Sequence, residues 1–178
     1  MKIQRLLFFA AVFCALLGYV VLVDSPLTKK PKTASQQLVR VFSFPESAIT
    51  GVEIHKGTVQ VKLTRHGKLW EMSIPSRATL HPDQADSLLS SIAGLIKIDV
   101  VGEGTSELGQ YGLNNPGMSL TLRFEGAAPV TLLVGSNCPT GVSMYGMLQG
   151  TKEVLQIGTL LRFSIDNLLD MYARPASR

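Results

Sequence analysis

Cys138 and Ser143 are the two residues of this sequence that could act as catalytic nucleophiles. A catalytic serine is typical of a G-x-S-x-G turn, and Ser143, within Gly141–Gly146, lacks that spacing. Cys138 with a distant histidine would make a thiol enzyme, but Pro139 beside it is typical of an ordinary turn. The spacing therefore predicts no catalytic residue, and an enzyme using Cys138 or Ser143 is the weakest of three functional hypotheses.

The three histidines do not form a metal-binding pattern. His55, His66 and His81 are scattered, and only His81 has an acidic residue, Asp83, two positions further on. We expect His55 on the polar face of a strand, His66 in a turn and His81 at a helix cap, all exposed to solvent. We predict no metal site.

A dinucleotide-binding loop is also not predicted. Gly102 and Gly104 have the spacing of the first two glycines of such a loop, but Glu107 stands where the third is required. The neighbouring strands are antiparallel in pattern, and no G-x-x-x-x-G-K-[ST] loop occurs. We therefore expect no cofactor.

Charge is distributed unevenly along the 178 residues. The formal net charge is +4, and five of the 17 basic residues but one of the 13 acidic residues precede Thr33. The remaining chain is neutral, whereas nucleic-acid binding requires clustered Lys and Arg to neutralise phosphates. We predict no nucleic-acid partner.

A long apolar segment near the N-terminus predicts a membrane anchor. Hydrophobic residues make up 46% of the chain, and Leu6–Val23 has no charge. Such a helix would be roughly 27 Å long, close to the hydrocarbon core of a bilayer. A cleavable signal peptide is the alternative, disfavoured because Val23-Asp24-Ser25 is a poor cleavage site and Pro26 follows it.

Orientation and the neighbouring segments complete the predicted organisation. Lysines lie on both sides of the apolar segment, so the distribution of positive charge does not decide its orientation in the membrane. A five-residue tail before the apolar run is typical of an anchor whose following domain lies outside the cytoplasm. We predict a cytoplasmic tail, a transmembrane helix, a Pro- and Lys-rich linker and an extracytoplasmic domain, at residues 1–5, 6–23, 24–37 and 38–178. The expected location is the bacterial inner membrane, with the lipid bilayer contacted through Leu6–Val23.

The domain alternates apolar and polar residues as strands do. Val52–His55 and Val59–Thr64 predict a hairpin, followed by a strand at Trp70–Ile74 and a helix over Asp83–Leu95. Strands follow at 96–101, 118–124, 130–134, 144–148 and 154–157, and a last helix at 159–172. The order predicts an α+β fold after the transmembrane helix, with a mainly antiparallel, strand-rich domain of two β-then-α halves, 38–96 and 97–172.

Several short motifs together resemble a known family. They are Val52-Glu53-Ile54, Leu69-Trp70-Glu71-Met72, Tyr111-Gly112-Leu113 with Pro116 after it, and Leu132-Leu133-Val134-Gly135. Over roughly Val39–Ile157 the chain is similar to family 4340 of the domains of unknown function. Its signature positions here are Trp70, Tyr111, Gly112, Leu113, Pro116 and Gly135.

The resemblance implies a bacterial protein anchored by one N-terminal helix, often found alongside ABC-type export or gliding-motility components. It implies no catalytic residues, and we interpret Tyr111-Gly112 as a helix end. The leading hypothesis is a non-enzymatic, single-pass accessory or assembly subunit of an envelope transport or motility complex, with an ABC-type permease or ATPase as partner. The alternative is an extracytoplasmic module that binds envelope polysaccharide or peptide in a groove between the halves.

Overall fold

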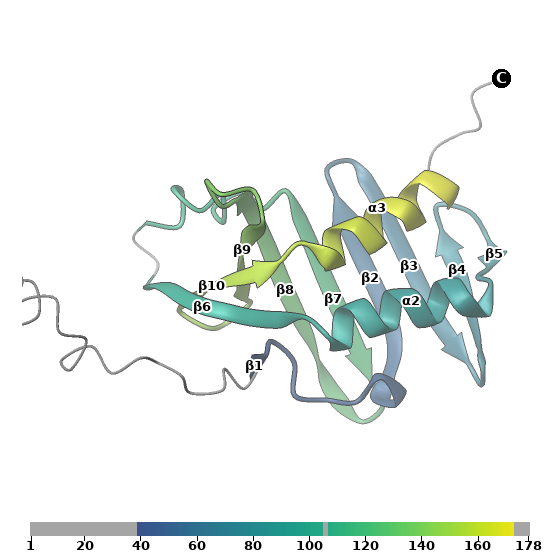
Figure 1. Cartoon of the computed structure of the whole chain (residues 1–178). Coiled ribbons are helices and arrows are strands. Elements are labelled where there is room, and N and C mark those ends of the chain that lie inside the picture. The colour runs from purple at the N-terminus through teal and green to yellow at the C-terminus, as the bar shows by residue number, and fades with distance from the viewer. Residues whose placement is uncertain (1–38, 105–106, 173–178) are drawn as a thin grey trace, which may run out of the picture. The chain divides into compact units, whose positions relative to one another are not determined.

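The structure is a computed structural model that describes residues 39–104 and 107–172, all within the unit Leu38–Arg178. These residues form strands, two α-helices and one short 3-10 helix (Figure 1). In chain order the elements are β1 (Val39–Arg40), η1 (Glu46–Ala48), β2 (Ile49–Lys56), β3 (Val59–His66), β4 (Leu69–Ile74), β5 (Ala78–Thr79), α2 (Pro82–Ala93), β6 (Ile96–Glu103), β7 (Met118–Phe124), β8 (Ala127–Asn137), β9 (Ser143–Leu148), β10 (Glu153–Gly158) and α3 (Leu160–Tyr172).

All the described strands belong to one antiparallel sheet, in the order β1-β6-β10-β9-β8-β7-β2-β3-β4-β5. The predicted fold class, α+β with two β-then-α halves, is therefore wrong, because the domain is mostly β and has no division at residue 97. The two expected halves share a ladder: β2 pairs with β7, for example Val52 with Leu122. This pairing satisfies backbone groups that two separate sheets would leave along unpaired edges.

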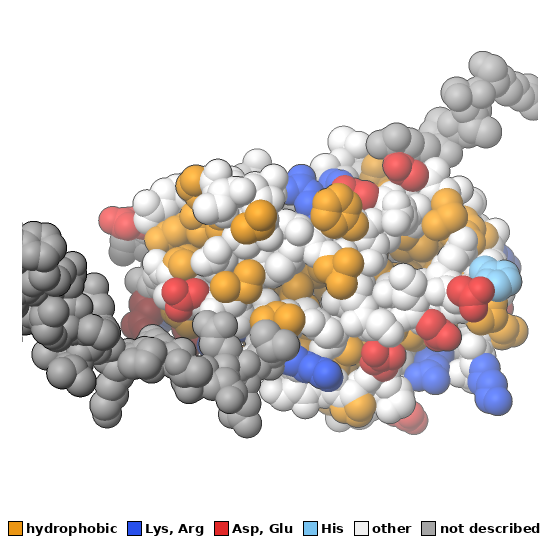
Figure 2. Space-filling model, viewed as in Figure 1, with side chains coloured by type: hydrophobic (Ala, Val, Ile, Leu, Met, Phe, Trp, Pro, Cys, Tyr) orange, Lys and Arg blue, Asp and Glu red, His pale blue; other side chains and the backbone are white. Residues whose placement is uncertain are grey.

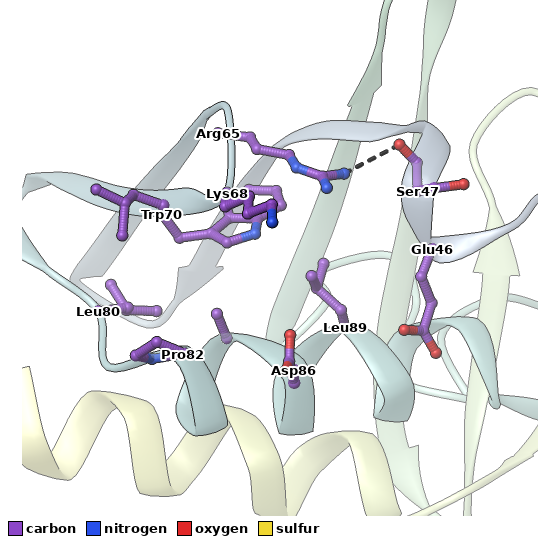
Figure 3. A pocket seen from close by; sticks show the side chains of 11 residues that line it. Glu46, Ser47, Arg65, Lys68, Trp70, Leu80, Pro82, Asp86 and Leu89 are labelled. Carbon is purple, nitrogen blue, oxygen red and sulfur yellow. Dashed lines mark hydrogen bonds between the residues drawn. The ribbon is translucent and has the colours of Figure 1, made fainter.

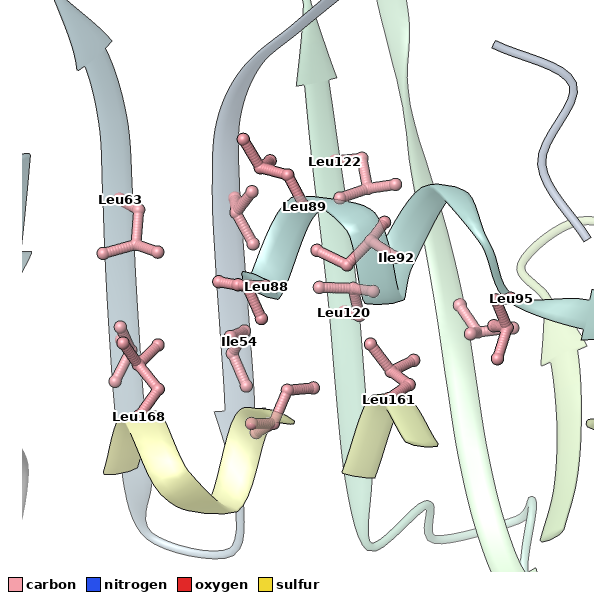
Figure 4. Packing of buried hydrophobic residues seen from close by; sticks show 14 of the residues in the cluster. Ile54, Leu63, Leu88, Leu89, Ile92, Leu95, Leu120, Leu122, Leu161 and Leu168 are labelled. Carbon is pink, nitrogen blue, oxygen red and sulfur yellow. The ribbon is translucent and has the colours of Figure 1, made fainter. Parts of the chain in front are cut away.

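Both helices lie on one face of the sheet (Figure 1). Leucine and isoleucine side chains of α2 and α3 pack against Ile54, Leu63 and Leu120 of the central strands, as Figure 4 shows. Leu120, Ile92 and Leu161 have no exposed surface. This single apolar layer between helices and sheet is the main core.

Most predicted elements are confirmed with small changes in their ends. The hairpin of β2 and β3 pairs Val52 with Leu63, and its turn uses Gly57 at φ +58°. The next hairpin turn uses Gly67 at φ +63°. Glycine adopts this left-handed conformation without a Cβ penalty, which is why Lys-Gly and His-Gly end these strands. The two predicted helices correspond to α2 and α3.

The face of the sheet opposite the helices carries a second, smaller apolar cluster. Its buried members are Leu113, Met147 and Val154, with Tyr111 and Tyr145 packed against them. Side chains alternate across a strand, so Met147 faces away from the side on which Met144 joins the main core. Residues 107–117, which lead into β7, therefore cover this end of the second face.

Polar side chains occupy the same face over β2, β3 and β7. Glu53 lies at their centre: its Oε2 accepts a hydrogen bond from Arg123 Nη2 at 3.1 Å. Its Oε1 accepts hydrogen bonds from Gln60 Nε2 at 3.0 Å and from His55 Nε2 at 3.2 Å. The hydrogen bond from Arg123 lowers the pKa of the Glu53 carboxyl below its ordinary value of 4.5, and the hydrogen bonds from His55 and Gln60 act in the same direction. Partial burial opposes this shift by raising the pKa.

We expect this network to make stability fall at acidic pH. The pKa of Glu53 is lower in the folded state than its ordinary value of 4.5, so the ionised carboxylate stabilises the fold at any pH above 4.5. This contribution is lost as the pH falls from 4.5 through the pKa of the folded state. Denaturant titrations from about pH 7 to about pH 3 should show the stability gap between wild type and Glu53→Gln narrowing below about pH 4.5. Glu125→Gln, at an exposed turn residue, is the control; a Glu53→Gln gap that stays constant with pH would contradict the prediction.

The predicted tail, membrane segment and linker, residues 1–5, 6–23 and 24–37, lie outside the described residues. Within 39–104 and 107–172, neither helix combines the length and the apolar character that a membrane crossing requires.

Candidate functional site

Five of the six signature positions lie near one another, in the segment before β7 and in β8. Gly135 lies directly against the Tyr111-Gly112-Leu113 turn: a Cβ added to Gly135 would be 2.1 Å from the Tyr111 carbonyl oxygen. The next residue, Ser136, donates its backbone N–H to the same oxygen at 2.9 Å. This close approach explains why the position carries glycine.

Tyr111 fastens the same segment to β6 and β9. Its hydroxyl donates a hydrogen bond to the Val101 carbonyl oxygen at 3.3 Å, and its ring packs edge-on against Tyr145 with centroids 4.9 Å apart. Gly102 leaves room for the ring, since an added Cβ there would be 3.0 Å from the Tyr111 hydroxyl oxygen. Leu113 is buried in the second apolar cluster, and Pro116 lies in the loop that leads to β7.

Gly112 has the left-handed conformation that the sequence predicts, with φ +69°. The interpretation of Tyr111-Gly112 as a helix end is wrong, because residues 107–112 form consecutive turns. The Leu113 N–H donates to the Leu108 carbonyl oxygen at 2.9 Å, as in the bond that closes many helices. The hydrogen-bond pattern typical of a helix end therefore occurs here at the end of a series of turns that is too short to form a helix.

The two potential nucleophiles lie close together at the β8–β9 turn, and both are buried. Ser143 has no exposed surface, and its Oγ accepts a hydrogen bond from Gln156 Nε2 at 2.7 Å. Cys138 is 7% exposed and contacts the Tyr145 hydroxyl. The hydrogen bond with Cys138, followed by burial, raises the pKa of the Tyr145 phenol.

The histidines lie on three different elements. Each has a carboxylate nearby: His55 has Glu53, His66 has Glu71 with Nε2 and Oε2 3.9 Å apart, and His81 has Asp83 with Nδ1 and Oδ2 3.5 Å apart. None of the described residues forms a group of three or more side chains suited to holding a metal ion.

The signature position Trp70 lies far from the other five, in β4. It borders a surface hollow of about 480 Å³ between the β3–β4 turn, η1 and the first turns of α2. Trp70 is 5% exposed and belongs to the core, but one side of its indole forms a wall of the hollow (Figure 3). This volume lies within the range of small-ligand pockets, about 300 to 1,000 Å³.

Charged side chains of both signs surround this hollow. Arg65 and Lys68 come from the β3–β4 hairpin, and Asp86 lies across the hollow on α2, with Glu46 on η1 (Figure 3). Arg65 is held by two carbonyl oxygens: Nη1 donates to Ser47 and Nε to Gly67, each at 3.0 Å. The hollow combines an aromatic wall with charged groups of both signs, and we name it the Trp70 pocket.

The sequence alone did not point to this pocket. Asp86 lies one helical turn from Asp83, a spacing that a solvated helix face explains. The signal that was available is the basic pair on both sides of His66-Gly67, directly before the only tryptophan of the chain. Asp166 of α3 forms an ion pair with Lys56 of β2.

Comparison with protein families matches residues 70–172 to the family described as Domain of unknown function (DUF4340). This range holds all six signature positions and confirms the resemblance, although it begins and ends later than the expected Val39–Ile157. Comparison with curated proteins and with solved structures finds no match.

Proposed function

The chain belongs to the DUF4340 family, and from this premise we propose a non-enzymatic accessory or assembly subunit of a bacterial envelope transport or motility complex. In this proposal, Leu6–Val23 attaches the protein to the inner membrane, and the sheet domain lies outside the cytoplasm. The domain binds a membrane protein of the complex, an ABC-type permease or its ATPase assembly.

The observation that carries this proposal is the exposed apolar side of α3. Leu160 is 67% exposed and Phe163 is 64% exposed, and residues three apart are neighbours on a helix surface. Met171, 53% exposed, follows eleven residues after Leu160 and therefore lies on the same side of the helix. Figure 2 shows hydrophobic side chains distributed over this helix-bearing face. Aromatic and methionine side chains are enriched at protein interfaces.

The environment of the potential nucleophiles supports a non-enzymatic role. Catalytic thiols are accessible and lie in electropositive surroundings, whereas Cys138 is buried beside Tyr145. A serine nucleophile requires a base within hydrogen-bond reach, whereas Ser143 Oγ is bonded to the Gln156 amide.

Cross-linked co-purification from mild detergent tests the proposal. We expect the full-length protein to recover a permease or ATPase in stoichiometric amounts, identified by mass spectrometry. Phe163→Asp should reduce that recovery by about tenfold or more, because a charge in an interface core costs several kcal/mol. Ile98→Asp, an equivalent change at an exposed residue of β6, is the control and should retain recovery. Recovery of the wild-type protein alone would contradict the proposal.

The Trp70 pocket favours a second candidate function, the binding of envelope polysaccharide or peptide by the same domain. The groove between two halves that the sequence suggested for this role is replaced by one continuous sheet. In the pocket beside Trp70, a small ligand would contact an aromatic ring and charged groups of both signs.

A further inference from the structure

We propose that the Trp70 pocket binds the backbone of a short peptide that has a free carboxylate and a free amine. This inference rests on the second candidate function and names its ligand. The carboxylate binds near Arg65, Lys68 and the Trp70 indole, and the amine binds near Asp86 and Glu46.

Trp70 supplies the first argument, because its indole N–H lacks a partner. No described residue accepts a hydrogen bond from it, although the side chain is only 5% exposed. No fully buried side-chain nitrogen or oxygen of the described residues is without a partner, so the indole nitrogen retains contact with solvent. The exposed part of this ring lines the pocket, and a ligand oxygen there would accept the unused hydrogen bond.

The basic side of the pocket supplies the second argument. Arg65 is oriented by the carbonyl oxygens of Ser47 and Gly67, so its guanidinium is held in place before a ligand arrives. Lys68 has no ion-pair partner among the described residues. The remaining N–H groups of the Arg65 guanidinium can donate to a ligand carboxylate, and Lys68 adds a second positive charge.

The acidic side separates a peptide from other ligands. Asp86 and Glu46 also have no ion-pair partner among the described residues, and Figure 3 places Asp86 across the pocket from the hairpin that carries Lys68. A neutral saccharide offers hydroxyl groups to both sides but no charge to match either, and a simple anion would match one side and be repelled by the other. A ligand with opposite charges at its two ends matches both sides, and a short peptide is the envelope ligand class with that pattern.

Titration of the full-length protein in detergent with the tripeptide trialanine tests this assignment. Trp70 is the only tryptophan, so its fluorescence reports events at the pocket directly. We expect a saturable change in emission, and at least about a tenfold loss of affinity when the peptide carboxylate is amidated. Lys68→Gln should reduce the affinity for trialanine by about the same factor. It should reduce the affinity for the amidated peptide little, because the substitution and the amidation remove the same interaction between Lys68 and the peptide carboxylate.

The amine is tested in the same way with Asp86→Asn. This variant should bind trialanine about tenfold more weakly but N-acetylated trialanine as the wild type does. Lys152→Gln and Glu125→Gln, at exposed positions outside the pocket, are the charge-matched controls and should bind trialanine normally.

Three outcomes would overturn the proposal: no saturable change up to about 10 mM trialanine, equal affinity for the amidated peptide, or equal binding of a neutral oligosaccharide. None of these would affect recovery of a permease or ATPase in the cross-linking experiment. Failure of the peptide site and failure of the accessory-subunit proposal are therefore distinguished.

Discussion

Gly135→Ala is expected to destabilise the folded domain by about 3 kcal/mol or more, as overpacking against rigid backbone does. The added methyl group would lie 2.1 Å from the Tyr111 carbonyl oxygen and 3.1 Å from the Gly112 carbonyl carbon. Both neighbours are backbone atoms, so no side chain can rotate away to make room. Urea titration followed by circular dichroism would measure the loss as a lower transition midpoint.

The turn that blocks the new methyl group cannot move without losing other interactions. Its Tyr111 carbonyl accepts the Ser136 N–H, and Gly112 already has a left-handed φ of +69°. Gly158→Ala is the matched control, since it also lies in a strand and an added Cβ there meets nothing within 4 Å. Equal midpoints for the two variants would contradict the proposed close packing of the signature turn on β8.

Leu161→Ala is the second substitution with a large expected effect, a loss of about 3 kcal/mol in the free energy of unfolding. Leu161 has no exposed surface and packs in the main core between α3 and the sheet (Figure 4). Removing its three outer carbon atoms loses their transfer free energy and leaves a cavity that the sheet cannot close.

The preceding residue provides the control for this substitution. Leu160→Ala makes the same chemical change one residue earlier in α3, at a side chain that is 67% exposed. We expect a change within about 0.5 kcal/mol there, as for most surface substitutions. Similar losses for Leu160→Ala and Leu161→Ala, measured by the same urea titrations, would show that α3 does not pack on the sheet as described.

The two positions also separate stability from function on one helix. Leu161 belongs to the core, whereas Leu160 and Phe163 belong to the surface that we propose as the partner contact. A variant of Phe163 that loses its partner while keeping the wild-type unfolding midpoint would therefore place the contact on α3. Loss of the partner together with stability would indicate a structural role instead.

Local pattern determined most of the secondary structure. Alternation over β2, β3 and β7 predicts which side chains face the core, because neighbouring residues of a strand point to opposite faces. Gly57 and Gly67 predict two hairpin turns, and the apolar stripes of α2 and α3 predict two helices. These features depend on residues close together in the chain, so the sequence alone contains them.

Long-range pairing decided the rest. The sequence could not show that β7 joins β2, or that β6 pairs with β10 on one side, because alternation identifies a strand's faces but not its neighbours. The expected two halves were wrong for this reason. Short motifs identify Gly135 and Tyr111 as signature positions, but only the folded chain brings their backbones into contact.

The Trp70 pocket shows the same division between local and tertiary information. Local alternation places Trp70 on a strand, and in the structure it is a buried residue of β4. Its pocket combines charges from η1, the β3–β4 hairpin and α2, three segments between residues 46 and 89 that no local period relates. Because electrostatic and hydrogen-bonding groups act over a few ångströms in space, only tertiary packing could turn these separate residues into one candidate site.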